Sequence, residues 1–192
     1  MFKQELNQQV NKNQKRLFVI HLYGSHPNAC ARIEDYKNNY IPKNKNLHNV
    51  SCYVASIEKT DKILNSIYDL LTEQQKKTGR SFSMLYFSDY GVSHSPTDDE
   101  IKLNLSNISV KVLDIPLMIF NSDSHRKKNI RAYKSGKLFI TGLANWLNIK
   151  NQKIDSDYSL FSETEDDHNI RRAFQYTKKF GDADIPIDIQ NK

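Results

Sequence analysis

The chain has 192 residues with 26% charged and 38% hydrophobic residues, which is typical of one ordinary globular domain with a substantial core. Its longest apolar runs, residues 17–22 and 115–120, are far shorter than the ~18 residues that a transmembrane helix requires, and residues 1–16 contain no secretory signal. The formal net charge of +6 suits acidic partners, but the scattered basic residues argue against specific nucleic-acid binding.

The first predicted strand covers residues 17–22, after a polar segment that predicts either a short helix or a frayed terminus. A polar turn containing a glycine follows it at residues 23–27. His26 in this turn is a candidate functional residue, because a side chain at a strand end can point at a substrate. His21 lies inside the strand, and we expect it to be packed in the core.

A long helix is predicted from Cys52 to Lys77, because apolar residues recur there at three- and four-residue spacings before Gly79. Asp61 lies four positions after Ile57 and would therefore sit on or beside the buried face. A buried carboxylate needs a partner. Asp61 thus has either a hydrogen-bonded structural role or a direct catalytic one.

The second predicted strand, residues 82–87, ends in Ser88-Asp89-Tyr90-Gly91. Ligands of open α/β sheets bind just outside the carboxyl ends of strands, so Asp89 is a candidate metal or phosphate ligand. The alternative is a carboxylate that caps the next segment or closes a turn. His94 follows in a loop, where it could reach the site or remain solvated.

A third strand is predicted at residues 114–120, a helix at 135–148 and an edge strand at 184–189. The strand at 17–22, the helix at 52–77 and the strand at 82–87 follow one another in the order of a βαβ unit, which indicates parallel pairing. We therefore predict an α/β fold with a largely parallel sheet flanked by helices. Residues 1–192 would form a single domain, with a core at 17–150 and an appendage at 151–192.

Cys30 and Cys52 are the only cysteines, and their spacing matches neither a zinc knuckle nor a redox motif. Two interpretations remain open at this point. They are either independent buried thiols in a reducing compartment or one disulfide in an oxidising compartment.

Four blocks of the sequence resemble, in this order, the carboxyl-terminal half of the sulfatase-like phosphoethanolamine transferases of the alkaline phosphatase superfamily. The blocks are residues 17–27, 52–61, 85–91 and 114–117. The hallmarks are Gly24-Ser25-His26 after a strand and the Ser-Asp pair at Ser88 and Asp89 before a glycine. The resemblance implies a partial alkaline-phosphatase or sulfatase-like fold for residues 17–150.

The same resemblance implies zinc-dependent transfer of phosphoethanolamine from phosphatidylethanolamine to lipid A or another surface glycan, a lipopolysaccharide modification. It places Asp89 among the zinc ligands and His26 near the transferred phosphate or the leaving group. It also implies location at the periplasmic face of the inner membrane. That oxidising compartment favours a disulfide between Cys30 and Cys52.

Three departures from the family pattern bear on activity. Tyr90 stands where the family has a histidine ligand, and a phenol, which ordinarily titrates near ~10, is a poor zinc ligand. A further expected histidine is missing, with Leu105 near its place. The segment with the nucleophilic threonine and the membrane-spanning part belong upstream of residue 17. We therefore expect the chain to be inactive alone; the alternative is a truncated, non-catalytic module that binds anionic lipid or a protein partner.

Overall fold

The structure is a computed structural model that describes residues 1–8, 14–96, 101–104, 110–124 and 126–167. These residues form two compact units, one up to residue 124 and one from 126 onward. The first unit contains α1 (Phe2–Leu6), the 3-10 helices η1 (Ala29–Arg32) and η2 (Lys45–Leu47), α2 (His48–Thr78), β1 (Ser83–Phe87), β2 (Ser93–Pro96), β3 (Ile101–Asn104), α3 (Val110–Leu113) and β4 (Leu117–Asn121). The second contains η3 (Gly136–Leu138) and α4 (Phe139–Trp146). The boundary expected at residue 150 falls within the second unit, and the single domain stays a prediction.

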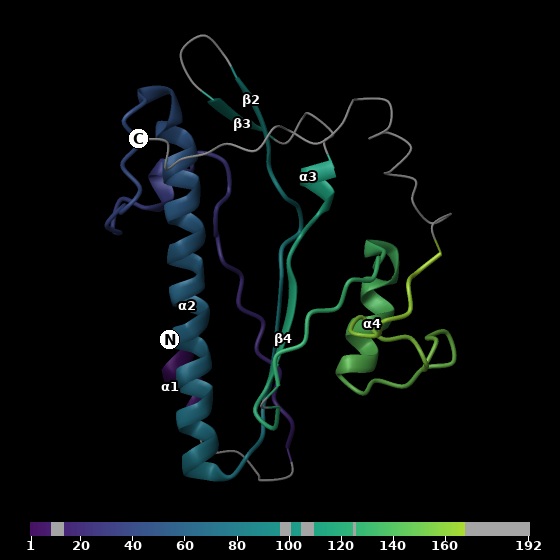
Figure 1. Cartoon of the computed structure of the whole chain (residues 1–192). Coiled ribbons are helices and arrows are strands. Elements are labelled where there is room, and N and C mark those ends of the chain that lie inside the picture. The colour runs from purple at the N-terminus through teal and green to yellow at the C-terminus, as the bar shows by residue number, and fades with distance from the viewer. Residues whose placement is uncertain (9–13, 97–100, 105–109, 125, 168–192) are drawn as a thin grey trace. The chain divides into compact units, whose positions relative to one another are not determined.

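Helix α2 is the longest element and spans 31 residues (Figure 1). It begins four residues before the predicted start and ends at Gly79, whose left-handed backbone (φ 71°) lets its N–H donate to the Gln75 carbonyl at 2.7 Å. Its buried face carries mainly small side chains: Ser51, Cys52, Ala55, Ser56 and Thr60. Small side chains allow another segment to approach the helix closely. No helix among the described residues has both the length and the apolar character needed to cross a bilayer.

The core of the first unit lies between η1 and the first turns of α2. Ala29 and Ile33 are buried there against Cys52 and Ala55. Lys59 on α2 donates to the Arg32 carbonyl at 2.9 Å. The connection predicted as partly irregular is thus held against α2 and contains two 3-10 helices.

The strands pair differently from the prediction. β1 pairs with β4 antiparallel, with Leu85 opposite Ile119, and β2 pairs with β3 antiparallel. The parallel pairing is wrong for these strands, because β4 follows β1 through β2, β3 and the short α3 rather than through a crossover helix. The Tyr68 ring on α2 packs beside the β1–β4 pair. Its centroid lies 5.5 Å from that of Phe82 and 6.1 Å from that of Phe120.

Residues 17–22 are extended but belong to no strand, which contradicts the prediction of a buried strand. Leu17 and Val19 are 57% and 86% exposed, and His21, expected in the core, is exposed as well. An apolar run predicts that its side chains are buried, but it does not specify which other segment covers them. Phe18 is the better packed residue, with its ring 5.4 Å from that of Phe2.

The second unit is organised around the buried Asp166 carboxylate. This group accepts hydrogen bonds from the Ser135 backbone N–H at 2.6 Å and from the Tyr158 hydroxyl at 3.0 Å, and Lys134 lies 3.7 Å away. Helices η3 and α4 confirm the helix predicted over 135–148. The edge strand predicted at 184–189 lies outside the described residues.

Candidate functional site

The turn after residues 17–22 meets the segment after β1. Gly24 gives this turn its left-handed backbone (φ 53°), and the His26 N–H donates to the Tyr23 carbonyl at 3.3 Å. The exposed His26 ring then lies 6.4 Å from the Tyr90 ring and 6.0 Å from the Tyr23 ring, centroid to centroid. Two candidates from distant parts of the sequence are therefore neighbours.

Gly91 fixes the segment that carries Asp89 and Tyr90. Its N–H donates to the Val112 carbonyl at 2.7 Å, and a Cβ at this position would lie 2.0 Å from the Lys111 carbonyl oxygen. Only glycine permits this approach of two backbones. Asp89 is left exposed, as a carboxylate that receives an incoming ligand would be.

Behind the turn, Ser25 forms a side-chain hydrogen bond with Tyr53 of α2. Burial raises the pKa of Tyr53, the hydrogen bond from Ser25 opposes this, and nearby Tyr86 of β1 adds to the rise. Burial also raises the pKa of Tyr86. Both phenols are therefore neutral at pH 7, and Tyr53 anchors the His26 turn to the helix.

Arg32 brings a positive charge to the same turn. Its guanidinium carbon lies 4.2 Å from the centroid of the exposed Tyr23 ring. Its Nε is buried and has no hydrogen-bond partner among the described residues. The charge of the guanidinium, rather than this buried nitrogen, suits an anionic group at the turn. Sequence reasoning missed Arg32, because it lies in a segment without periodicity and only its proximity to His26 in sequence could have signalled it.

Two other candidates lie elsewhere. Asp61 is exposed, so the expected position on or beside the buried face is wrong. Ile57, four residues earlier, is itself 46% exposed, and Thr60 occupies the inward position instead. His94 lies in β2, opposite Leu103, rather than in a loop.

Zinc requires three or four suitable ligand atoms close together. His26 and Asp89 offer an imidazole and a carboxylate, but Tyr90 contributes a phenol. Among the described residues, the group of three metal-binding side chains is a different one, Cys30, His48 and Cys52. The described residues around His26 therefore do not complete a zinc site by themselves.

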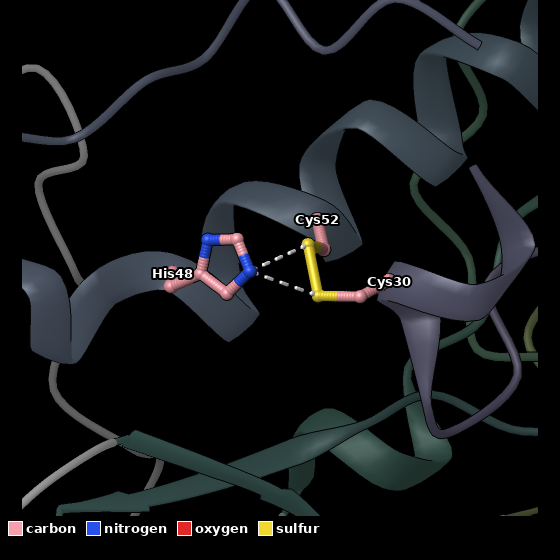
Figure 2. A group of neighbouring side chains, drawn as sticks. All are labelled: Cys30, His48 and Cys52. Atoms are coloured by element: carbon pink, nitrogen blue, oxygen red, sulfur yellow. Dashed lines mark hydrogen bonds between the residues drawn. A yellow bond between two sulfur atoms is a disulfide. The ribbon is translucent and has the colours of Figure 1, made fainter. Parts of the chain in front are cut away.

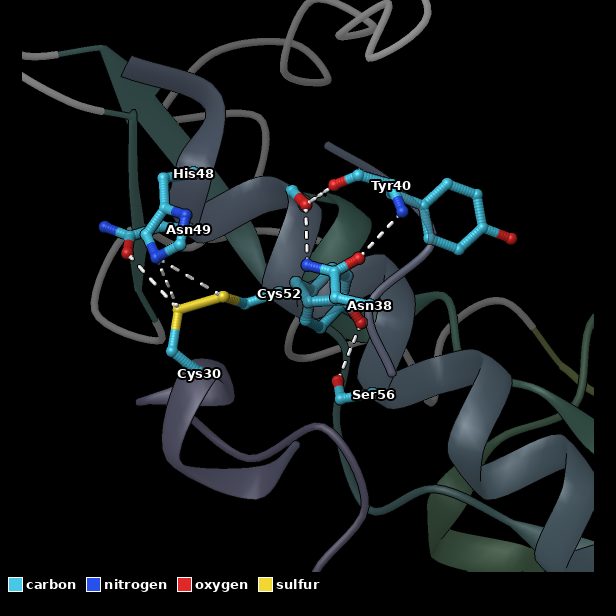
Figure 3. The surroundings of a disulfide bond; sticks show 9 residues. Cys30, Asn38, Tyr40, His48, Asn49, Cys52 and Ser56 are labelled. Carbon is cyan, nitrogen blue, oxygen red and sulfur yellow. Dashed lines mark hydrogen bonds between the residues drawn. A yellow bond between two sulfur atoms is a disulfide. The ribbon is translucent and has the colours of Figure 1, made fainter. Parts of the chain in front are cut away.

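Cys30 and Cys52 form a disulfide that joins η1 to α2, with His48 beside it (Figure 2). Figure 3 shows its surroundings, which include Asn38 and Tyr40. The Asn38 side chain donates to the Ser51 hydroxyl at 2.9 Å. Sulfur atoms in a disulfide are not thiolates, so this group is no metal site in the oxidised state.

Comparison with known proteins identifies the protein family of the chain. Residues 1–149 match the sulfatase family. The chain belongs to this family, within its phosphoethanolamine-transferase-like group, and the family implies an alkaline-phosphatase-like α/β fold and metal dependence. No solved structure matches the chain significantly.

Two curated relatives illustrate the similarity. The chain is 42% identical over 123 residues to a Haemophilus influenzae protein named "Putative phosphoethanolamine transferase", covering 61% of this chain and 25% of the relative. It is 30% identical over 152 residues to the phosphoethanolamine transferase OpgE of Escherichia coli K12, covering 79% of this chain and 27% of OpgE. The chain thus spans about a quarter of the length of these relatives.

Proposed function

We propose that this chain supplies one corner of a phosphoethanolamine-transfer site, of the kind that the names of its relatives indicate. The donor would be phosphatidylethanolamine, and the acceptor lipid A or another surface glycan. The observation that carries the proposal is the contact between His26 and Tyr90, which brings together the two turns that bear the family hallmarks.

The residues of this part of the transfer site have distinct roles in the proposal. His26 holds a proton near the leaving group, and the positive charge of the Arg32 guanidinium, which lies over the Tyr23 ring, attracts the phosphoryl oxygens. Asp89 would be one ligand of a metal whose other ligands come from the remainder of the domain. Tyr53 and Ser25 position the turn that carries His26.

This part of the transfer site needs further catalytic groups before it can turn over substrate. The described residues near His26 lack a third zinc ligand and the threonine nucleophile that the resemblance requires. We therefore propose that zinc and activity depend on the remainder of a sulfatase-like domain, whether in the same polypeptide or in a separate one. The Cys30–Cys52 disulfide supports location in an oxidising compartment such as the periplasm.

The test is a complementation assay. The chain is mixed with the upstream three quarters of an OpgE-like protein, zinc, phosphatidylethanolamine vesicles and a glycan acceptor, and the product is detected by mass spectrometry. We expect transfer only in the mixture, and a loss of about 10²–10⁴-fold for His26→Ala if His26 is the proton donor. The control is His21→Ala, which changes an exposed histidine of the preceding segment.

Two results would contradict the proposal. Transfer by the chain alone would show that its site is complete. Full activity of the His26→Ala variant in the mixture would remove His26 from the chemistry.

The second candidate function is a non-catalytic binding module. The net charge of +6 and the exposed apolar side chains of Leu17, Val19 and Ile20 favour it. If the module binds anionic lipid, the chain will sediment with phosphatidylglycerol vesicles at low salt and be released at high salt. If vesicle binding does not depend on salt, the binding module would bind a protein partner instead of lipid. A pull-down with the upstream part of an OpgE-like protein tests this alternative.

A further inference from the structure

The imidazole of His48 faces both sulfur atoms of the disulfide (Figure 2). Its Nε2 lies 3.6 Å from Cys30 Sγ and 3.8 Å from Cys52 Sγ. In a tetrahedral zinc site, with Zn–S near ~2.3 Å and Zn–N near ~2.0 Å, neighbouring ligand atoms lie about 3.5–3.8 Å apart. The nitrogen is therefore already at ligand spacing from both sulfurs.

Two of the three groups are placed by one helix. His48 and Cys52 are four residues apart at the start of α2, so they project from the same face of the helix. This arrangement depends on the helix and not on the disulfide. His48 is exposed and Cys52 is buried, so an ion could enter from the His48 side.

The third group, Cys30, is held by contacts that do not involve the disulfide. Ala29 and Ile33, on either side of it, are buried against α2. The Lys59 ammonium on α2 donates to the Arg32 carbonyl at 2.9 Å and forms an ion pair with Asp35. Reduction of the disulfide would therefore leave Cys30 next to Cys52 and His48.

We propose that Cys30, His48 and Cys52 form a redox-controlled zinc site, separate from the proposed transfer site. A dithiol reductant supplies two electrons and two protons to the disulfide, which becomes two thiols while the reductant becomes a disulfide. Zn²⁺ then displaces the two thiol protons and binds two thiolates and the His48 imidazole. Water is available for the fourth position, and Asn49, whose Oδ1 lies 3.9 Å from Cys30 Sγ, lies beside the sulfur (Figure 3).

The link between η1 and α2 is made by a different bond in the oxidised and in the reduced state. In the oxidised state the disulfide links η1 to α2 covalently, and in the reduced state zinc makes the same link through coordination. The site thus preserves the packing of η1 on α2 under both conditions. It also gives the chain a zinc affinity that depends on the redox state.

The experiment uses the full chain, either oxidised or reduced with a phosphine that does not compete strongly for metal, titrated with Co²⁺ as a spectroscopic probe. We expect one equivalent to bind the reduced chain, with thiolate-to-cobalt charge-transfer bands and tetrahedral d–d bands, and Zn²⁺ to displace it. The oxidised chain should give no charge-transfer band. His48→Ala should weaken Zn²⁺ binding by more than about tenfold, since loss of even an outer-shell partner has that effect, and His21→Ala should not.

A second measurement does not depend on variants. Zn²⁺ should slow alkylation of the two thiols in the reduced wild-type chain, and a chelator should restore the rate. The proposal is overturned if cobalt binds without charge-transfer bands, if zinc leaves the alkylation rate unchanged, or if a His48→Ala chain with wild-type circular dichroism binds zinc as tightly as the wild type.

Discussion

The imidazole ring of His26 and the phenol ring of Tyr90 lie 6.4 Å apart, centroid to centroid, at an interplanar angle of 65°. This contact joins the turn after residues 17–22 to the turn after β1. It forms although residues 17–22 are not a strand. Loop geometry, supported by Gly24 and Gly91, therefore brings the two hallmark segments together.

Substitution of Tyr90 by histidine should raise zinc affinity when the remainder of a sulfatase-like domain is supplied. An imidazole at this position, beside His26 and Asp89, is a much better zinc ligand than a phenol, and we expect a gain of about tenfold or more. Calorimetry on mixtures that contain the wild-type or the Tyr90→His chain measures the zinc affinity, and Ile140→His, at an exposed position of the second unit, is the control. Equal affinity with Tyr90 in place would show that the site does not need a histidine there.

Gly91→Ala should destabilise the first unit by ~3 kcal/mol, because the new Cβ would lie 2.0 Å from the backbone oxygen of Lys111. Urea unfolding followed by far-ultraviolet circular dichroism, to which the long α2 contributes strongly, measures the change. Gly136→Ala is the matched control, since no atom of the described part of the chain lies within 4 Å of its added Cβ. Unchanged stability of Gly91→Ala would mean that the two backbones separate at little cost.

The stability of the first unit should fall at alkaline pH in part because of Tyr53. Burial raises the pKa of Tyr53 above its usual value of 10.0, so the phenol ionises more readily in the unfolded chain. Its contribution is complete below pH ~10 and is lost as pH rises through the folded pKa. Unfolding curves across this range should show a shallower loss of stability for Tyr53→Phe than for wild type. The same slope in both chains would contradict the assignment, and Tyr23→Phe is the exposed control.

Asp166→Ala should destabilise the second unit by about 3 kcal/mol, because it leaves buried hydrogen-bond donors of Ser135 and Tyr158 without their acceptor. Fluorescence of Trp146, the only tryptophan, reports unfolding of this unit. Asp157→Ala, at an exposed carboxylate, serves as control and should change stability by less than ~0.5 kcal/mol. Similar unfolding midpoints for both variants would show that Asp166 is not central to the unit.

Local sequence signals located the longest helix, the strands β1 and β4 and the helical segment of the second unit. The apolar periodicity and Gly79 predicted α2 to within a few residues, and the helix at 135–148 agrees with η3 and α4. Strand pairing was not available from such signals, because the direction of β4 relative to β1 depends on the path of the chain between them. The burial of α2 was also misjudged at Asp61, because its inward face carries small rather than large side chains.

The sequence by itself determined the family, the positions of His26 and Asp89 in polar turns, and Tyr90 as the residue in place of an expected histidine. These are properties of residue type and order, which a motif records directly. Only the tertiary structure placed the His26 ring against Tyr90, the Arg32 guanidinium over the Tyr23 ring, and His48 beside the Cys30–Cys52 disulfide. Such juxtapositions come from packing between segments that are distant in sequence, and no local pattern encodes them.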